Sequence, residues 1–82
     1  MNVKHRLLGP NFYCIDIDID NVVLWFSYET CIAFAVKGHT VVSVNVWSKT
    51  TGKHLNQIDD DKSNRIPYDA FCAMLDAVRI GE

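Results

Sequence analysis

The sequence predicts a single α+β domain, residues 1–82, in which an antiparallel sheet of about four strands is followed by two short helices on one face. Residues 12–47 predict the sheet, because they are rich in β-branched and aromatic residues and in places alternate apolar with polar side chains. Residues 48–58 and 67–80 predict the helices, because apolar residues recur there at helical spacing. The length of 82 residues fits one domain.

Residues 1–11 are expected to be a leader that ends in the turn Gly9-Pro10-Asn11. Whether Val3 to Leu8 forms a short strand stays open. Phe12 to Ile19 predicts a strand, because apolar and polar residues alternate along it. This alternation places two sets of side chains on opposite faces: Tyr13, Ile15, Ile17 and Ile19 on one, Cys14, Asp16, Asp18 and Asp20 on the other.

The three carboxylates of that strand, Asp16, Asp18 and Asp20, are candidates to hold a hard cation or to mimic a phosphate backbone. The calcium-loop pattern of EF-hands fails, because residue 21 is not glycine and Ser27 stands where that loop needs a glutamate. We favour a solvated outer face, or an edge strand whose charges prevent pairing with other chains.

Residues 22–36 are long for one strand, so we expect a break or bulge at Ser27 to Thr30, with a single bent strand as the alternative. Lys37-Gly38-His39 predicts a hairpin turn, because glycine readily takes a positive φ. The valine-rich segment Thr40 to Trp47 is then expected to pair antiparallel with Ile32 to Val36.

Ser48 is a favourable N-cap for the first helix, residues 48–58. Gly52 weakens that helix by about 1 kcal/mol relative to alanine, so a loop is the competing interpretation. The apolar spacing that favours a helix is carried by Trp47, Thr51, Leu55 and Ile58.

The second helix, residues 67–80, follows residues 59–66, an Asp-rich segment that predicts a solvated linker. Pro67 suits the first helical position, Asp69 suits the positive end of the helix, and Gly81 ends it. The apolar stripe of this helix consists of Phe71, Met74, Leu75 and Val78.

Charge and cysteine content argue against several function classes. Eight Lys and Arg against ten Asp and Glu give a formal net charge of -2, which is unusual for a general polyanion binder. Three cysteines without metal-binding spacing predict free thiols in a reducing cytoplasm, and neither a metal nor a cofactor. The apolar run Val22 to Tyr28 is far too short to span a bilayer, so no membrane association is expected.

The candidate site lies in residues 47–56, which combine hydroxyls, lysines and a histidine directly after the apolar strands. Thr51-Gly52-Lys53 resembles the end of a nucleotide-binding P-loop but fails its pattern. Trp47 stands where the first glycine belongs, and His54 stands where a Ser or Thr must follow the lysine.

A helix capped by Ser48 offers another way to bind an anion, because the amides of residues 49–51 then point outward at its positive end. Lys49 and Lys53 lie one turn apart on the same face, and Trp47 offers a stacking plane. A capped helix with merely solvated lysines explains the pattern equally well. Residues 27–30 are either the opposite wall of the site or only a satisfied bulge. The expected ligand-binding residues are Tyr28, Thr30, Trp47, Ser48, Thr50, Thr51, Lys53 and His54.

Catalysis would need a nucleophile beside a base, and the available pairs are Cys31 with His39 or His54, and Ser48 with His54. Neither a nucleophile elbow nor a signature of a cysteine-enzyme family accompanies these residues. We therefore expect no enzymatic activity.

Two runs of the sequence resemble a group of small uncharacterised bacteriophage proteins with the pattern SYxTxIAF…WSxTTxKHxN. The runs are Ser27-Tyr28-Glu29-Thr30-Cys31-Ile32-Ala33-Phe34 and Trp47-Ser48-Lys49-Thr50-Thr51-Gly52-Lys53-His54-Leu55-Asn56. The resemblance covers roughly residues 22–58. It implies a viral accessory protein made in the cytoplasm of an infected bacterium, and it implies no mechanism.

These observations lead us to expect a non-enzymatic phage accessory protein that binds a host or phage protein or an anionic small molecule. Counter-defence is one role for a protein of this size, by analogy alone. The apolar content of 49% in so short a chain predicts a homo-oligomer, a dimer above all. The alternative is a nucleic-acid-binding regulator that uses the basic segment 48–65, with phosphate contacts from Lys49, Lys53, His54, Lys62 and Arg65.

Overall fold

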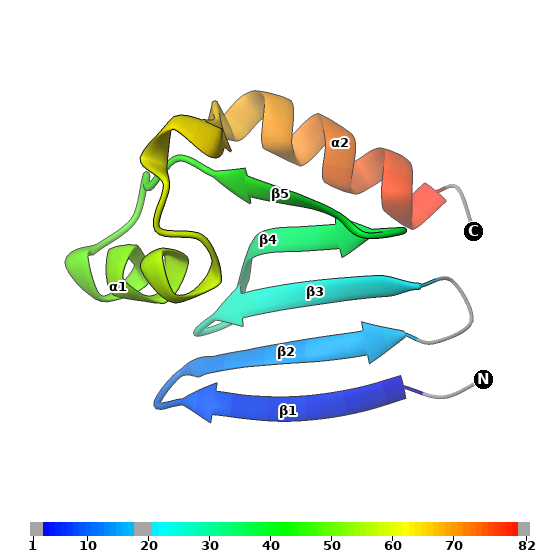
Figure 1. Ribbon diagram of the computed structural model, residues 1–82, viewed down its shortest axis with the longest axis horizontal. Coiled ribbons are helices and arrows are strands. Elements are labelled where there is room, and N and C mark those ends of the chain that lie inside the picture. Colours follow the sequence, from blue (N-terminus) through cyan, green and yellow to red (C-terminus); the bar gives the residue numbers. More distant parts are fainter. Residues whose placement is uncertain (1–2, 18–20, 81–82) are drawn as a thin grey trace.

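The computed structural model describes residues 3–17 and 21–80 of the chain, with side chains up to residue 77. Six strands form one sheet in chain order, and two helices flank it (Figure 1). The fold class is therefore α+β, as predicted. The elements in order are β1 (Val3–Gly9), β2 (Phe12–Ile17), β3 (Val22–Ser27), β4 (Thr30–Val36), β5 (His39–Ser43), α1 (Lys49–Ile58), the short 3-10 helix η1 (Lys62–Asn64), β6 (Arg65–Ile66) and α2 (Tyr68–Ile80).

The predicted antiparallel sheet extends over β1 to β5, and β6 adds a parallel partner for β5. The sheet thus has six strands instead of about four. The two extra strands come from segments assigned to a leader and a linker, whose polar composition concealed them.

The expected leader, residues 1–11, is instead largely the edge strand β1, which pairs antiparallel with β2. Pro10 and Asn11 form the connecting turn, in which Asn11 has a φ of 57°. A proline followed by a residue with a positive φ is typical of a type II turn. Six of the seven β1 residues are exposed, so an apolar stripe was not required for the strand to form.

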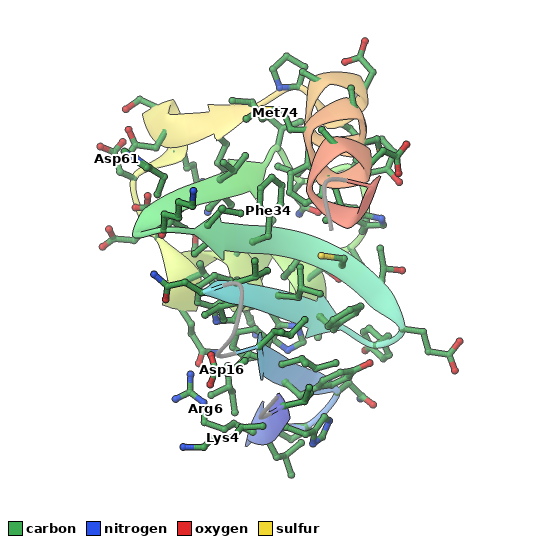
Figure 2. All side chains as sticks on the ribbon, turned by 90° about the vertical axis from the view of Figure 1, so that its right-hand side faces the viewer. Lys4, Arg6, Asp16, Phe34, Asp61 and Met74 are labelled. Carbon is green, nitrogen blue, oxygen red and sulfur yellow. The ribbon has the colours of Figure 1, made fainter. Side chains whose placement is uncertain are left out.

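The alternating faces predicted for β2 are confirmed over residues 12–17, but the strand is not an edge. Cys14 is buried on one face, and Asp16 on that face forms an ion pair with Arg6, Nε to Oδ2, at 3.0 Å. Figure 2 shows Arg6 and Asp16 together near the edge of the sheet that lies far from α2. Asp18 and Asp20, the other two carboxylates of the proposed cation site, lie outside the described residues.

The predicted break in residues 22–36 is a tight turn at Tyr28 and Glu29 between β3 and β4. Tyr28 has a φ of 58°, and its N–H donates to the Asn11 carbonyl at 2.7 Å. The expected hairpin turn is formed by Lys37 and Gly38, with φ of 52° and 85°, so β4 pairs antiparallel with β5 as predicted. Consecutive positive φ values suit the twist of a two-residue hairpin.

Helix α1 confirms the helix predicted for residues 48–58, with Ser48 as its N-cap. Leu55 is fully buried in a cluster on one face of the sheet, and Trp47 and Ile58 pack against that cluster. The strand residues of the cluster are Phe12, Ile32, Ala33 and Val42.

Helix α2 packs on the other face, so the expectation that both helices share one face is wrong. Phe71 of α2 is fully buried, and its ring lies 5.5 Å from that of Phe34. Phe34 directly follows Ala33, which belongs to the cluster under α1. Because neighbouring residues of a strand point to opposite faces, the two helices cover opposite sides of β4.

The segment between the helices is more than the expected linker, residues 59–66. Arg65 and Ile66 pair with Val42 and Ser43, and the Ile66 carbonyl accepts the N–H of Val44 at 2.9 Å. The strand predicted for residues 40–47 accordingly ends at Ser43.

The start of α2 lies one residue later than predicted, because the Pro67 carbonyl accepts the N–H of Phe71. Pro67 thus stands just before the helix. Of the predicted apolar stripe, Phe71 is buried, Leu75 half-buried and Met74 46% exposed. The Val78 side chain and Gly81 lie outside the part of the chain that is described.

Replacing Phe71 with alanine tests the packing of α2. Removal of a fully buried phenylalanine costs about 3–5 kcal/mol of unfolding free energy, which is a large part of the stability of a small domain. Met74→Ala on the same helix is the matched control and should cost less than about 1 kcal/mol. Urea unfolding measures both, and equal losses would contradict the described packing of α2.

Candidate functional site

The start of α1 uses part of the helix end that was expected to bind an anion. The Ser48 hydroxyl oxygen accepts the N–H of Thr51 at 3.3 Å, and the Ser48 carbonyl accepts the N–H of Gly52 at 2.9 Å. One of the three amides proposed for an anion is thus already satisfied within the protein. Ser48 acts here as a cap that fixes where the helix begins.

A chain of side-chain hydrogen bonds links the start of α1 to the end of β3. Ser48 Oγ lies 3.4 Å from Thr51 Oγ1, Thr51 Oγ1 lies 3.0 Å from Ser27 Oγ, and Ser27 Oγ lies 2.6 Å from His54 Nδ1. Each hydroxyl donates once if His54 is neutral and accepts at Nδ1. Ser27, Thr51 and His54 are all buried, so these bonds replace water that the groups have lost.

His54 is a packing residue in this arrangement. Its ring stacks on Phe12 with centroids 4.5 Å apart and an interplanar angle of 5°. Burial lowers the pKa of His54 below its ordinary value of 6.5, because the imidazolium loses hydration there. The neutral ring is therefore favoured, in agreement with its role as a hydrogen-bond acceptor.

Residues 27–34 and 47–56, two runs far apart in the chain, meet in this chain of hydrogen bonds. Ser27 comes from the first run, and Thr51 and His54 come from the second. Ser27 and His54 have the spacing of a nucleophile and a base, yet the Ser27 side chain is 2% exposed. Its hydroxyl is enclosed between the sheet and α1, where it joins the two elements.

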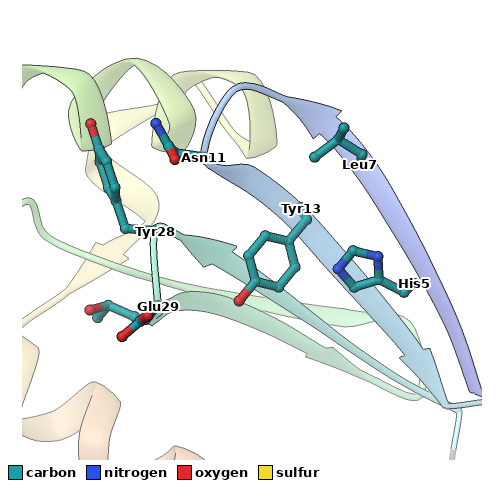
Figure 3. A pocket seen from close by; sticks show the side chains of 7 residues that line it. His5, Leu7, Asn11, Tyr13, Tyr28 and Glu29 are labelled. Atoms are coloured by element: carbon teal, nitrogen blue, oxygen red, sulfur yellow. The ribbon is translucent and has the colours of Figure 1, made fainter.

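The other predicted site residues lie in different surroundings. Trp47 is half-buried, with its ring edge-on to Tyr68 at 5.3 Å, and Thr50 is exposed on α1. Tyr28 and Thr30 line a hollow of about 700 Å³ together with residues of β1 and β2. Figure 3 shows Tyr13 in this hollow between His5 and Glu29. The ring of Tyr28 also lies 6.5 Å from that of His54, so Tyr28 stands at the border between this hollow and α1.

The structure therefore does not bring the eight predicted residues together. Ser48, Thr51 and His54 connect α1 to the sheet, while Tyr28 and Thr30 border a separate hollow. Of the eight, only Lys53 lines a second hollow, which lies beside α1 and is rich in cations.

The basic hollow, as we call it, is an open depression of about 460 Å³ between α1 and the segment that follows it. Residues 49, 52, 53 and 56 form one wall, because helical spacing brings them to the same flank of α1. The residues that line the hollow are Asn45, Lys49, Gly52, Lys53, Asn56, Lys62 and Arg65.

The four cations of the basic hollow lack carboxylate partners. Among residues 3–17 and 21–77, no Asp or Glu oxygen lies within 4.0 Å of the charged nitrogens of Lys49, Lys53, Lys62 or Arg65. The carboxylates of the nearby segment, Asp59 and Asp61, accept hydrogen bonds from residues of that same segment. Asp59 accepts from Asp61 N–H and Asn64, and Asp61 accepts from Ser63.

Arg65 is held in place while part of its guanidinium stays unsatisfied. Its Nη2 donates to Asn56 Oδ1 at 2.7 Å and lies 3.4 Å from the Asp59 carbonyl. Its Nε is buried without a hydrogen-bond partner in the described structure. A buried donor without a partner is uncommon in native proteins.

Gly52 gives the basic hollow its shape. A Cβ on Gly52 would lie 2.9 Å from Asn45 Nδ2. Asn45 in turn donates from Nδ2 to the Ser48 carbonyl at 2.9 Å and accepts the Trp47 N–H at 3.0 Å. The glycine that weakens the helix thus allows Asn45 to brace the turn before it. Sequence reasoning missed Asn45, because no short motif marks it.

The fold and the basic hollow define a small α+β domain with a cationic surface site. The chain belongs to the family of unknown function DUF8033, whose model matches residues 1–73. The match includes all six strands and α1, so it covers most of the fold. No curated protein and no solved structure matches the chain significantly.

The described residues contain no cluster of three or more His, Cys, Asp or Glu side chains that could hold a metal ion. They also contain no helix that is both long and apolar enough to cross a membrane.

Protonation of His54 should destabilise the protein in acid. Its pKa is lower in the folded than in the unfolded state, so the unfolded state binds the proton more readily. The stability that the neutral ring contributes is fully present above pH 6.5, the ordinary pKa of histidine. It is lost as the pH falls from 6.5 through the lowered pKa of the folded state. One proton gives at most about 1.4 kcal/mol per pH unit.

Urea unfolding between about pH 7.5 and pH 5 measures this dependence. His54→Gln keeps a hydrogen-bond acceptor without a titrating group and should flatten the curve. His39→Gln, at an exposed position, should leave it as in the wild type. An unchanged slope in His54→Gln would show that another group senses the pH.

Proposed function

We propose that the protein is a small non-enzymatic binding protein whose basic hollow holds an anionic ligand that bears a phosphate or phosphoryl group. The observation that supports this most strongly is the gathering of Lys49, Lys53, Lys62 and Arg65 around one depression, without carboxylate partners among the described residues. The chain as a whole carries a net charge of -2. This positive cluster is therefore a local feature, in contrast to the net charge of the protein.

The chemistry of the lining suits an anion with several oxygens. Lys49 and Lys53 supply mobile ammonium groups on one wall, and Arg65 faces them with a guanidinium held by Asn56. Guanidinium groups bind phosphate through paired hydrogen bonds, whereas lysines act as point charges. The absence of a side chain at Gly52 lets Asn45 approach α1 and line the hollow beside the lysines.

This proposal needs α1 to be held in one position, which the interior residues provide. Ser48, Thr51 and His54 act indirectly, by fixing the helix against Ser27. Trp47 and Thr50 lie at the start of the same helix and would contact only the outer part of a larger ligand.

The phage-like pattern supports a wider setting for this activity. We place the protein among bacteriophage accessory proteins that act in the cytoplasm of an infected bacterium, with counter-defence as one role. In that setting the anion is either a free small molecule or part of a host or phage protein, such as a phosphorylated or acidic segment.

Lys53→Gln tests the basic hollow directly. Inorganic pyrophosphate should raise the melting temperature of the wild type, because a ligand that binds only the folded state stabilises it. Loss of one charge-assisted contact should weaken binding about tenfold, which corresponds to about 1.4 kcal/mol. Isothermal titration calorimetry with pyrophosphate at constant ionic strength gives the affinity.

Lys4→Gln is the matched control, because it removes the same charge from β1 at the opposite edge of the sheet. It should bind pyrophosphate like the wild type. Equal weakening in both variants would indicate nonspecific attraction and contradict the proposal, as would absence of pyrophosphate binding by the wild type.

Nucleic-acid binding is the second candidate, favoured by the same four cations. If all four contact the phosphates of a single-stranded nucleic acid, a plot of the logarithm of the affinity against the logarithm of the salt concentration should have a slope of about -3. Fluorescence anisotropy with a labelled oligonucleotide measures it. A flat salt dependence would reject this alternative, and the net charge of -2 already counts against it.

A further inference from the structure

Strand β1 is an exposed edge of the sheet. It pairs with β2 alone, and six of its seven residues are exposed. The other edge, β6, has only two residues and lies beside η1 (Figure 1). A long edge strand presents unpaired backbone N–H and C=O groups, which form a template for another strand. β1 can therefore pair with a strand of another chain through its free backbone edge.

The side chains of β1 strengthen this conclusion. Leu7 is 73% exposed and Val3 is 56% exposed, and both lie on the same face as His5. No other large apolar side chain of the described residues is as exposed as Leu7. Among these residues, β1 has no proline or bulge before Leu7. Its charged residues Lys4 and Arg6, of the kind that can keep another strand away, lie on the opposite face from Val3 and Leu7.

We propose that β1 pairs antiparallel with β1 of a second copy of the chain, around a two-fold axis at His5. Val3 then lies opposite Leu7 of the second copy, and this apolar pair occurs twice. The two His5 residues meet at the centre, and Lys4 lies opposite Arg6. The result is one continuous sheet through both copies, with the exposed edge removed from each.

The apolar residues of β1 set this register. The pairing with β2 is regular from Val3 to Leu7 and shifts between Leu7 and Gly9, and an axis at His5 places Val3 opposite Leu7 within this regular part. Opposite residues of an antiparallel pair share a face, so the axis must pass through a residue. An axis at Arg6 would leave Val3 opposite Gly9, which has no side chain to pack, and would separate Leu7 from Val3 of the second copy.

The neighbours of His5 and Arg6 fit the same arrangement. Arg6 is paired with Asp16 at 3.0 Å, which offsets its repulsion from Lys4 of the second copy. On the other face, the rings of His5 and Tyr13 lie 4.9 Å apart, and those of Tyr13 and Phe26 lie 5.2 Å apart. This row of rings would continue across the axis into the second copy. A closed two-fold pair also leaves no β1 edge for further growth.

The proposal goes beyond ligand binding, because β1 and the basic hollow lie at opposite edges of the sheet. Sedimentation equilibrium or native mass spectrometry should therefore find a wild-type dimer of twice the chain mass of 9.3 kDa without added ligand. Leu7→Lys should be a folded monomer, because a lysine at this exposed position harms only the interface. Met74→Lys, a similar change at an exposed site on α2, should remain a dimer.

A cross-link tests the register. His5→Cys should form a disulfide-linked dimer on mild oxidation, because the two residues at position 5 face each other across the axis. Arg6→Cys and the wild type, treated alike, should not. A monomeric wild type at about 100 μM, which is well above the dissociation constants of stable dimers, would overturn the proposal. A dimer that persists in Leu7→Lys, or cross-linking at position 6 instead of position 5, would do the same.

Discussion

The attachment of α1 to the sheet through buried hydrogen bonds is the constraint on which the rest of this structure depends. Ser27 at the end of β3 contacts both Thr51 and His54, so two turns of the helix are fixed at one point. Leu55 fills the apolar space beside these groups. Buried polar groups are costly when unpaired, so only one placement of the helix satisfies all of them. The flank of α1 with Lys49 and Lys53 is thereby held toward the segment that follows the helix.

Local sequence signals predicted the parts of the fold that depend on neighbours in the chain. The alternation in β2, the turn at Lys37 and Gly38, and the Ser48 cap each predicted what the structure contains. Whether Val3 to Leu8 forms a strand stayed open because an edge strand needs no apolar face, and β6 was missed because two residues carry no periodicity. The placement of the helices on opposite faces follows from Phe71 meeting Phe34, a long-range contact that no local pattern encodes.

The candidate site shows the same division between local and long-range information. The sequence singled out the polar residues of 47–56 as a unit, and the spacing of Lys49 and Lys53 on one flank was apparent. The turn of the helix sends these residues in different directions: Thr51 and His54 are buried in the protein, while Lys53 is exposed. Their partner Ser27 is far away in the chain, so the interior role of His54 could not be deduced from the sequence. Arg65 joins the basic hollow only because β6 pairs with β5.

The parallel pairing of β6 with β5 has a consequence for the order in which the protein assembles. Strands β1 to β5 are joined in sequence by short turns, so their contacts close small loops and can form early. β6 reaches β5 only after the chain has passed through α1 and η1, so we expect it to be the last strand to join the sheet. Arg65 arrives at the basic hollow with this step. We therefore expect the hollow to be complete only in the fully folded chain, and its ability to bind an anion to report the end of folding.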